Sequence, residues 1–209
     1  MLPWILLTVV ALAGLLAAEA RSYQLGVYLF KPLASTGFVG AAVASGAVFS
    51  TYGRIILLAL LLSWLGDVLL IPAGEGTLLA GLGSFLLAHV AFGSAFALRG
   101  QALAWTAAAL VVLAAIAIFV VRWLRPHLPA GMRLPVFVYI AVITVMVALA
   151  AGTVAAGSPR IILAGAVAFF LSDLSVANDR FVHKSFVNDL WGLPLYYAAQ
   201  LCLAASVRA

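Results

Sequence analysis

The chain has 209 residues, of which 67% are apolar and only 8% are charged. A soluble domain carries roughly a quarter of charged residues, so this composition excludes both a soluble globule and a disordered chain. It is typical of an integral membrane protein. The net charge of +5 comes from bases scattered singly, which favours lipid headgroups over nucleic acid as the partner. The single Cys202 excludes a disulfide framework.

The N-terminal segment resembles a signal peptide in one respect, because Ala18-Glu19-Ala20 is similar to a cleavage site. No Lys or Arg precedes its apolar run, however, and a signal peptide has a positive n-region. We therefore expect this segment to be a retained first span.

Eight apolar segments are long enough, or nearly long enough, to cross about 30 Å of hydrocarbon as helices. They are Leu2–Ala18, Tyr28–Phe49, Ile55–Ile71, Leu78–Leu98, Leu103–Val121, Pro135–Ala156, Ile161–Ala177 and Leu190–Val207. Gly, Pro and Ser residues typical of turns separate them, and no linker has room for a soluble domain. The sequence therefore predicts an all-α protein: one polytopic bundle of eight transmembrane helices that forms a single domain over residues 1–209.

An even number of spans places both termini on one face, here named side A, and the opposite face is side B. Side B carries seven bases: Arg21, Lys31, Arg122, Arg125, Arg133, Arg180 and Lys184. Side A carries four: Arg54, Arg99, Arg160 and Arg208. The positive-inside rule favours side B as cytoplasmic. The two sides tie if Lys31, Arg180 and Lys184 serve a binding site instead. We expect a multi-pass protein of a bacterial-type inner or plasma membrane.

Two segments half a chain apart resemble each other. Arg54-Ile55-Ile56-Leu57 corresponds to Arg160-Ile161-Ile162-Leu163, and at the same spacing Leu65-Gly66-Asp67 corresponds to Leu171-Ser172-Asp173. This favours two halves of four spans, residues 1–102 and 103–209, related by an axis along the membrane normal. Asp67 and Asp173 would then lie at equal depth, in the half of the membrane nearer side B.

A carboxylate inside a spanning helix costs on the order of 3 kcal/mol, so two at matched depth need a reason. A structural role, with buried polar partners, is one alternative. In the catalytic alternative, Asp67 and Asp173 converge in a pocket of low dielectric, where both cannot easily be ionised. We then expect them to share a single proton and to act as an acid and a base.

Further polar residues gather toward side B and predict a pocket that opens there. The candidates for substrate binding are Lys31, His89, Asn178, Arg180, Tyr196, Tyr197 and Gln200. Tyr196 and Gln200 are four residues apart and share a helix face. Each residue also has an ordinary alternative, since Lys31 can extend to the interface, His89 can be a packing residue, and the tyrosines can be belt aromatics.

Five sequence blocks together resemble the signature of the YhhN / transmembrane protein 86 family. They are Lys31-Pro32-Leu33, Ser63-Trp64-Leu65-Gly66-Asp67-Val68-Leu69-Leu70, Phe85-Leu86-Leu87-Ala88-His89-Val90-Ala91-Phe92, Phe170-Leu171-Ser172-Asp173 and Tyr196-Tyr197-Ala198-Ala199-Gln200-Leu201. A mild departure follows the second aspartate, where the family often continues Leu-Ala and this chain has Leu174-Ser175-Val176-Ala177.

The resemblance implies an eight-span lysoplasmalogenase, which cleaves the vinyl-ether bond of a lysoplasmalogen with water. The products would be a fatty aldehyde and glycerophosphoethanolamine or glycerophosphocholine, with Asp67 and Asp173 as the paired catalytic acids and no cofactor or metal. Two alternatives stay open. One is a small-solute or proton-coupled transporter that uses the same acids. The other is a metal site built from Asp67, His89 and Asp173, which lacks a tight ligand motif.

Overall fold

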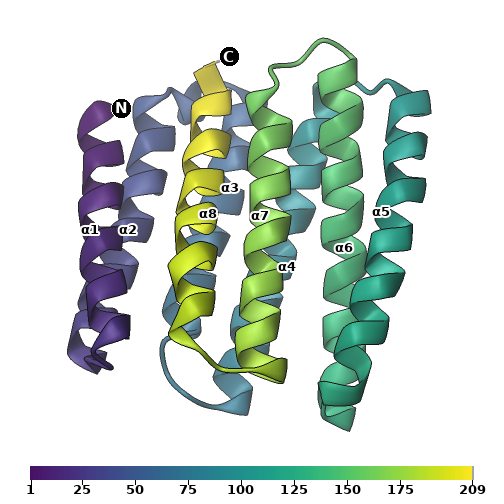
Figure 1. Cartoon of the computed structure of the whole chain (residues 1–209). Coiled ribbons are helices and arrows are strands. Elements are labelled where there is room, and N and C mark those ends of the chain that lie inside the picture. The colour runs from purple at the N-terminus through teal and green to yellow at the C-terminus, as the bar shows by residue number, and fades with distance from the viewer. Residues whose placement is uncertain (209) are drawn as a thin grey trace.

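The structure is a computed structural model that describes residues 1–208, and it is a bundle of eight helices with no strand among those residues (Figure 1). The helices are α1 (Leu2–Ala20), α2 (Gln24–Ala44), α3 (Thr51–Leu69), α4 (Glu75–Leu98), α5 (Leu103–Leu124), α6 (Ala130–Ala155), α7 (Ile161–Ala177) and α8 (Phe186–Ala205). All eight are long and apolar enough to span a membrane. The predicted all-α, eight-span fold is confirmed, and both termini lie at side A, the upper end in Figure 1.

Helix boundaries differ from the sequence prediction where capping decides them. The second span ends at Ala44 and not at Phe49, because Gly46 takes a left-handed conformation with φ of 88° and a short 3₁₀ turn follows. Helix α8 begins earlier than predicted, since the Ser185 hydroxyl accepts a hydrogen bond from the Val187 amide at its N-terminus. A π-helical turn, Asn178–Val182, extends α7 toward side B.

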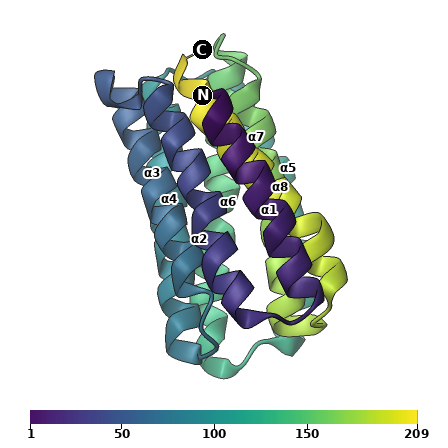
Figure 2. The ribbon, with the colours of Figure 1, turned by 90° about the vertical axis from the view of Figure 1, so that its left-hand side faces the viewer.

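Small residues allow α1 to pack closely on α2. A Cβ atom at Gly37 would collide with Thr8, and one at Gly40 would overlap the Trp4 ring. Helix α1 also packs on α8, as the view in Figure 2 shows. Packing of this kind stabilises helices in lipid, where burial from water is not the driving force. The closely spaced glycines of α2 therefore serve contacts within one molecule.

The predicted internal repeat is not confirmed. Some pairings recur, since α1 packs on α2 as α5 does on α6, and α3 packs on α4 as α7 does on α8. The outer helices are not equivalent, however: α1 also packs on α8, whereas α5 makes no comparable contact with α4 and packs substantially only on α6. The division into two halves stays a prediction.

The apolar core is divided in a way that leaves room for a site. The larger cluster joins α1–α4 with α6–α8 and includes Phe38, Phe92, Phe169 and Tyr197. The smaller one joins α5 and α6, and its buried residues are Val120, Leu124, Leu128, Met132, Val136 and Ile140. Residues of both clusters line one cavity, so the cavity lies between the two parts of the core.

Candidate active site

A cavity of about 370 Å³ extends from the side B ends of the helices into the bundle. Charged and polar residues at helix ends and connections form its mouth, and these include Glu19, Gln24 and Lys184. Its inner walls carry both predicted catalytic acids, Asp67 and Asp173, among apolar side chains. The cavity therefore joins a polar entrance to a mostly apolar interior.

Asp67 is held by two hydroxyl groups. It lies near the side B end of α3 with 3% of its surface exposed. The Ser35 hydroxyl from α2 and the Tyr196 hydroxyl from α8 both donate to its Oδ2, at 2.6 and 2.7 Å. Hydroxyl donors stabilise the ionised form of a carboxyl. Burial disfavours the ionised form of Asp67, whereas the two hydroxyls and Lys31, one turn before Ser35, favour it.

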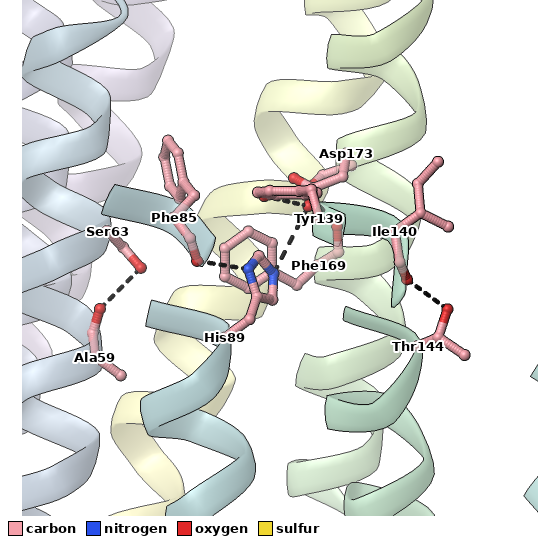
Figure 3. Close-up of polar contacts among 10 residues, drawn as sticks. Ala59, Ser63, Phe85, His89, Tyr139, Ile140, Thr144, Phe169 and Asp173 are labelled. Atoms are coloured by element: carbon pink, nitrogen blue, oxygen red, sulfur yellow. Dashed lines mark hydrogen bonds and ion pairs between the residues drawn. The ribbon is translucent and has the colours of Figure 1, made fainter. Parts of the chain in front are cut away.

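Asp173 has a different environment, formed by Tyr139 of α6 and His89 of α4 (Figure 3). The Tyr139 hydroxyl donates to Oδ2 of Asp173 at 2.7 Å. The Nε2 atom of His89 lies 3.6 Å from the same oxygen, and it has no hydrogen-bond partner among the described residues. His89 itself is only 1% exposed and packs on the Phe169 ring at 4.5 Å between ring centroids.

The hydrogen bond of His89 to the backbone fixes where its proton lies. Nδ1 is 2.6 Å from the Phe85 carbonyl oxygen, which can only accept, so Nδ1 carries the hydrogen. The Nε2 atom of a neutral ring then presents a lone pair to Asp173. Two acceptors that face each other are unfavourable, because nothing attractive lies between them. One proton between His89 and Asp173 removes this repulsion.

The two acids line the same cavity but do not bond to each other. In residues 1–208, no hydrogen bond joins Asp67 to Asp173, and each has its own set of partners. The prediction that they converge in a pocket is compatible with this geometry, whereas the expected proton shared between them has no counterpart in it. Within residues 1–208, the hydrogen bonds of both carboxyls go to Oδ2, and both residues line the cavity.

The mouth carries charges of both signs. Lys31, Arg180 and Lys184 line it together with Glu19, Asp179 and Asp189. Arg180 donates to the Leu70 carbonyl oxygen at 3.1 Å, which holds its guanidinium at the rim. Within the part of the chain that the structure describes, none of these six side chains forms a salt bridge with another. The basic groups therefore remain available to an anionic group of a ligand.

Residues 26–207 match the model of the YhhN family. The chain belongs to the YhhN family. The match includes both acids and every residue that lines the cavity except Glu19 and Gln24. The resemblance seen in the sequence blocks is thereby confirmed.

Three curated relatives of this YhhN protein are named lysoplasmalogenase. Proteins named lysoplasmalogenase from Mycobacterium bovis and Mycobacterium tuberculosis are each 34% identical over 208 residues, covering 95% of this chain and 77% of the relative. The Bos taurus protein named lysoplasmalogenase TMEM86A is 29% identical over 168 residues, which is 72% of this chain and 64% of the relative. No solved structure matches the chain significantly.

The other residues that the sequence predicts for substrate binding differ in their positions relative to the cavity. Tyr196 lines it, and so do Lys31 and Arg180. Tyr197 does not line it; its hydroxyl donates to the Lys31 carbonyl oxygen at 3.3 Å and also lies 3.4 Å from the Ser35 hydroxyl oxygen. Gln200 is fully buried with both amide atoms unpartnered. Asn178 lies outside the cavity and donates to the Asn188 side chain at 2.8 Å.

Sequence reasoning missed Ser35 and Tyr139, the hydroxyl donors to the two acids. A signal existed for Ser35, because it lies four residues after Lys31 and therefore shares its helix face. Tyr139 stands alone in a strongly apolar span, and only its polar group in that setting marks it. No group of three or more His, Cys, Asp or Glu residues suited to a metal occurs among residues 1–208.

Proposed function

We propose that this YhhN-family protein is a membrane lysoplasmalogenase that hydrolyses the vinyl-ether bond of lysoplasmalogens by acid–base catalysis. One observation carries the proposal: two carboxyls from different helices, Asp67 and Asp173, face a single cavity that is apolar inside and charged at its mouth. The names of the curated relatives support the same activity. The substrate is an amphiphile, and the cavity offers both of the environments that it needs.

In the first step Asp173 acts as the acid. Vinyl ethers are labile to acid because protonation of the β-carbon gives an oxocarbenium ion. Asp173 gives its proton to that carbon and becomes a carboxylate. The lone pair that His89 directs at Asp173 supports this assignment, because it favours a proton on the Asp173 side of the pair. Tyr139 holds the carboxyl in place through its hydroxyl.

In the second step Asp67 acts as the carboxylate. Its charge stabilises the oxocarbenium ion and it takes a proton from the water that adds to the α-carbon. The hemiacetal then collapses: Asp67 gives the proton it took from water to the leaving glycerol oxygen, and Asp173 takes the hydroxyl proton, which releases the fatty aldehyde and restores both carboxyls. One water is consumed and no cofactor is needed. The two hydroxyls that donate to Asp67 support this role, since they favour its ionised form.

The headgroup is expected at the mouth. Lys31 and Arg180 are placed to bind the phosphate of the substrate, and Arg180 can do so with two parallel hydrogen bonds. The fatty chain then extends into the apolar interior. Side B would face the cytoplasm if the excess of bases there sets the orientation.

The test uses purified protein in detergent and compares a lysoplasmalogen with its saturated ether analogue. We expect aldehyde to be released from the first substrate alone. Asp67→Asn and Asp173→Asn are each expected to lower the rate by about 10²- to 10⁴-fold, the usual contribution of a general acid or base. Glu75→Gln makes the same chemical change outside the cavity and should retain activity.

Retained hydrolysis in both Asn variants would remove the acid–base assignment.

The transporter alternative gains no support from the geometry. The cavity opens toward side B, and edge-to-face ring contacts join Phe85, in its wall, to Phe169 and Phe169 to Phe92. Uptake of substrate without aldehyde release would nevertheless favour that alternative.

A further inference from the structure

Helix α5 lies at one edge of the bundle, opposite α1, and yet contributes to the cavity wall (Figure 1). Only two of its residues are buried, Val120 and Leu124, and both line the cavity. Together with residues of α4 and α6 they form an apolar arm of the cavity. This apolar arm consists of Leu78, Leu82, Val120, Leu124, Val136, Ile140 and Ile143. The cavity therefore reaches the last helix before the lipid.

A second hollow lies on the outer surface beside this arm. This outer groove, of about 400 Å³, is lined by Phe119, Trp123, Leu174, Asn178 and Trp191, from α5, the α7 region and α8. Leu174 belongs to both linings, that of the cavity and that of the groove. A single leucine side chain is therefore common to the wall of the cavity and the floor of a groove that faces the bilayer.

The seam between α5 and α7 is weakly packed. Helix α5 packs substantially on α6, and its contacts with α7 are slight. Phe119 is 72% exposed and Trp191 39% exposed, so large apolar side chains at the groove have no cover within the described chain. In a membrane these side chains meet acyl chains, and the tryptophans lie toward side B, where indole rings favour the interface.

From these observations we infer that the outer groove binds the hydrocarbon chain of the amphiphilic substrate, and that Leu174 is the gate through which this chain passes sideways from the bilayer into the apolar arm. The inference rests on the proposed function and adds the route and binding site of the chain. A headgroup bound at Lys31 and Arg180 can stay at the interface throughout, because both residues lie at the mouth on side B. Only the chain has to cross the seam.

The direct experiment is photolabelling with a saturated ether lysolipid that carries a diazirine at the end of its chain. This probe cannot be hydrolysed, so the labelling does not depend on activity. We expect label on Leu174 and on the groove residues Phe119 and Trp123, reduced by an excess of unlabelled lysolipid. Label confined to other helices, for example at Val27 and Tyr28 on the α2 wall of the cavity, or absent from the seam, would overturn the inference.

A second experiment tests the gate by bulk. Leu174→Trp is expected to raise the KM for a long-chain lysoplasmalogen by about tenfold or more, because the larger side chain takes up space between the two hollows through which the chain would pass. The same change should lower kcat/KM clearly less for a water-soluble analogue with a short vinyl-ether chain than for the long-chain substrate, since the short chain does not occupy the gate. Val167→Trp, two turns away on α7 and outside both hollows, is the matched control.

Equal losses with the long and the short substrate would show that Leu174 only shapes the reaction centre, and the gate would be rejected. If the unaltered protein releases no aldehyde from either substrate, the proposed function fails, and photolabelling still decides whether the groove binds a lipid chain. The two failures are therefore distinguishable.

Discussion

Two neighbouring tyrosines offer a sensitive comparison of the catalytic site. Tyr196 and Tyr197 are both buried, and their hydroxyls go to different acceptors. That of Tyr196 donates to the Asp67 carboxyl at 2.7 Å, whereas that of Tyr197 has only neutral partners, the Lys31 carbonyl oxygen at 3.3 Å and the Ser35 hydroxyl at 3.4 Å. The substitutions Tyr196→Phe and Tyr197→Phe remove one oxygen each and keep both rings in the core. Only the first acts directly on a proposed catalytic group.

The size of the effect follows from the acceptor. A hydrogen bond to a charged group contributes about 1.5–3 kcal/mol, and each 1.36 kcal/mol is about tenfold in rate. Tyr196→Phe should therefore lower kcat by about 10- to 150-fold if Asp67 works as a carboxylate. The long bond of Tyr197 to a neutral acceptor contributes about 1 kcal/mol or less, so its variant should lose about fivefold at most.

The assay is aldehyde release from a lysoplasmalogen by each variant in detergent, with thermal unfolding as the measure of structure. Both variants should stay folded, and the loss in Tyr196→Phe should be larger at acidic than at alkaline pH, because a carboxylate with one donor fewer is protonated more easily. Equal losses in the two variants, or a Tyr196→Phe enzyme of full activity, would refute the view that this hydroxyl maintains the Asp67 carboxylate.

Three further variants test other parts of the structure. His89→Leu removes the acceptor that faces Asp173 and should reduce kcat by about 10- to 100-fold, while the affinity for a saturated analogue, measured by competition, stays the same. Arg180→Gln should raise KM for the lysoplasmalogen by about tenfold and leave kcat nearly unchanged, since it removes a charge at the mouth and no reacting group. Gly37→Leu should lower the Tm of the detergent-solubilised protein, because its side chain would enter α1 at Thr8, whereas Gly83→Leu meets open space and should leave the Tm unchanged.

The fold could be predicted from the sequence because the membrane severely limits the structures that can span it. A span must satisfy its own backbone, so eight apolar segments separated by turn residues allow little besides a helical bundle. The same apolar composition gives little information about which residues face the interior of the bundle. All-round apolar helices carry almost no periodic signal for the face that points inward, and the expected partners of Asp67 and Asp173 could not be derived from spacing alone. A serine and a tyrosine on other helices supply them.

The directions in which side chains leave α8 explain why Tyr196, Tyr197 and Gln200 have different surroundings. Consecutive residues on a helix point about 100° apart, and of the two tyrosines only Tyr196 lines the cavity. Gln200 shares the face of Tyr196 but lies one turn deeper, among buried side chains and outside the cavity lining. The sequence placed all three near the site, and the direction of each side chain required the packing of α8 on α2 and α7.

The position of Lys31 relative to Asp67 connects the mouth to the chemistry. Ser35, which donates to Asp67, lies four residues after Lys31, or about 6 Å along the axis of α2. In a lysoplasmalogen five bonds of roughly 1.5 Å join the phosphorus to the ether oxygen, and in an extended chain they also span about 6 Å. A phosphate bound near Lys31 would thus place the vinyl-ether carbons at the depth of the carboxyls. Under the proposed function, the depth of the polar site would follow from the length of the glycerol backbone, and the apolar arm would receive the fatty chain beyond it.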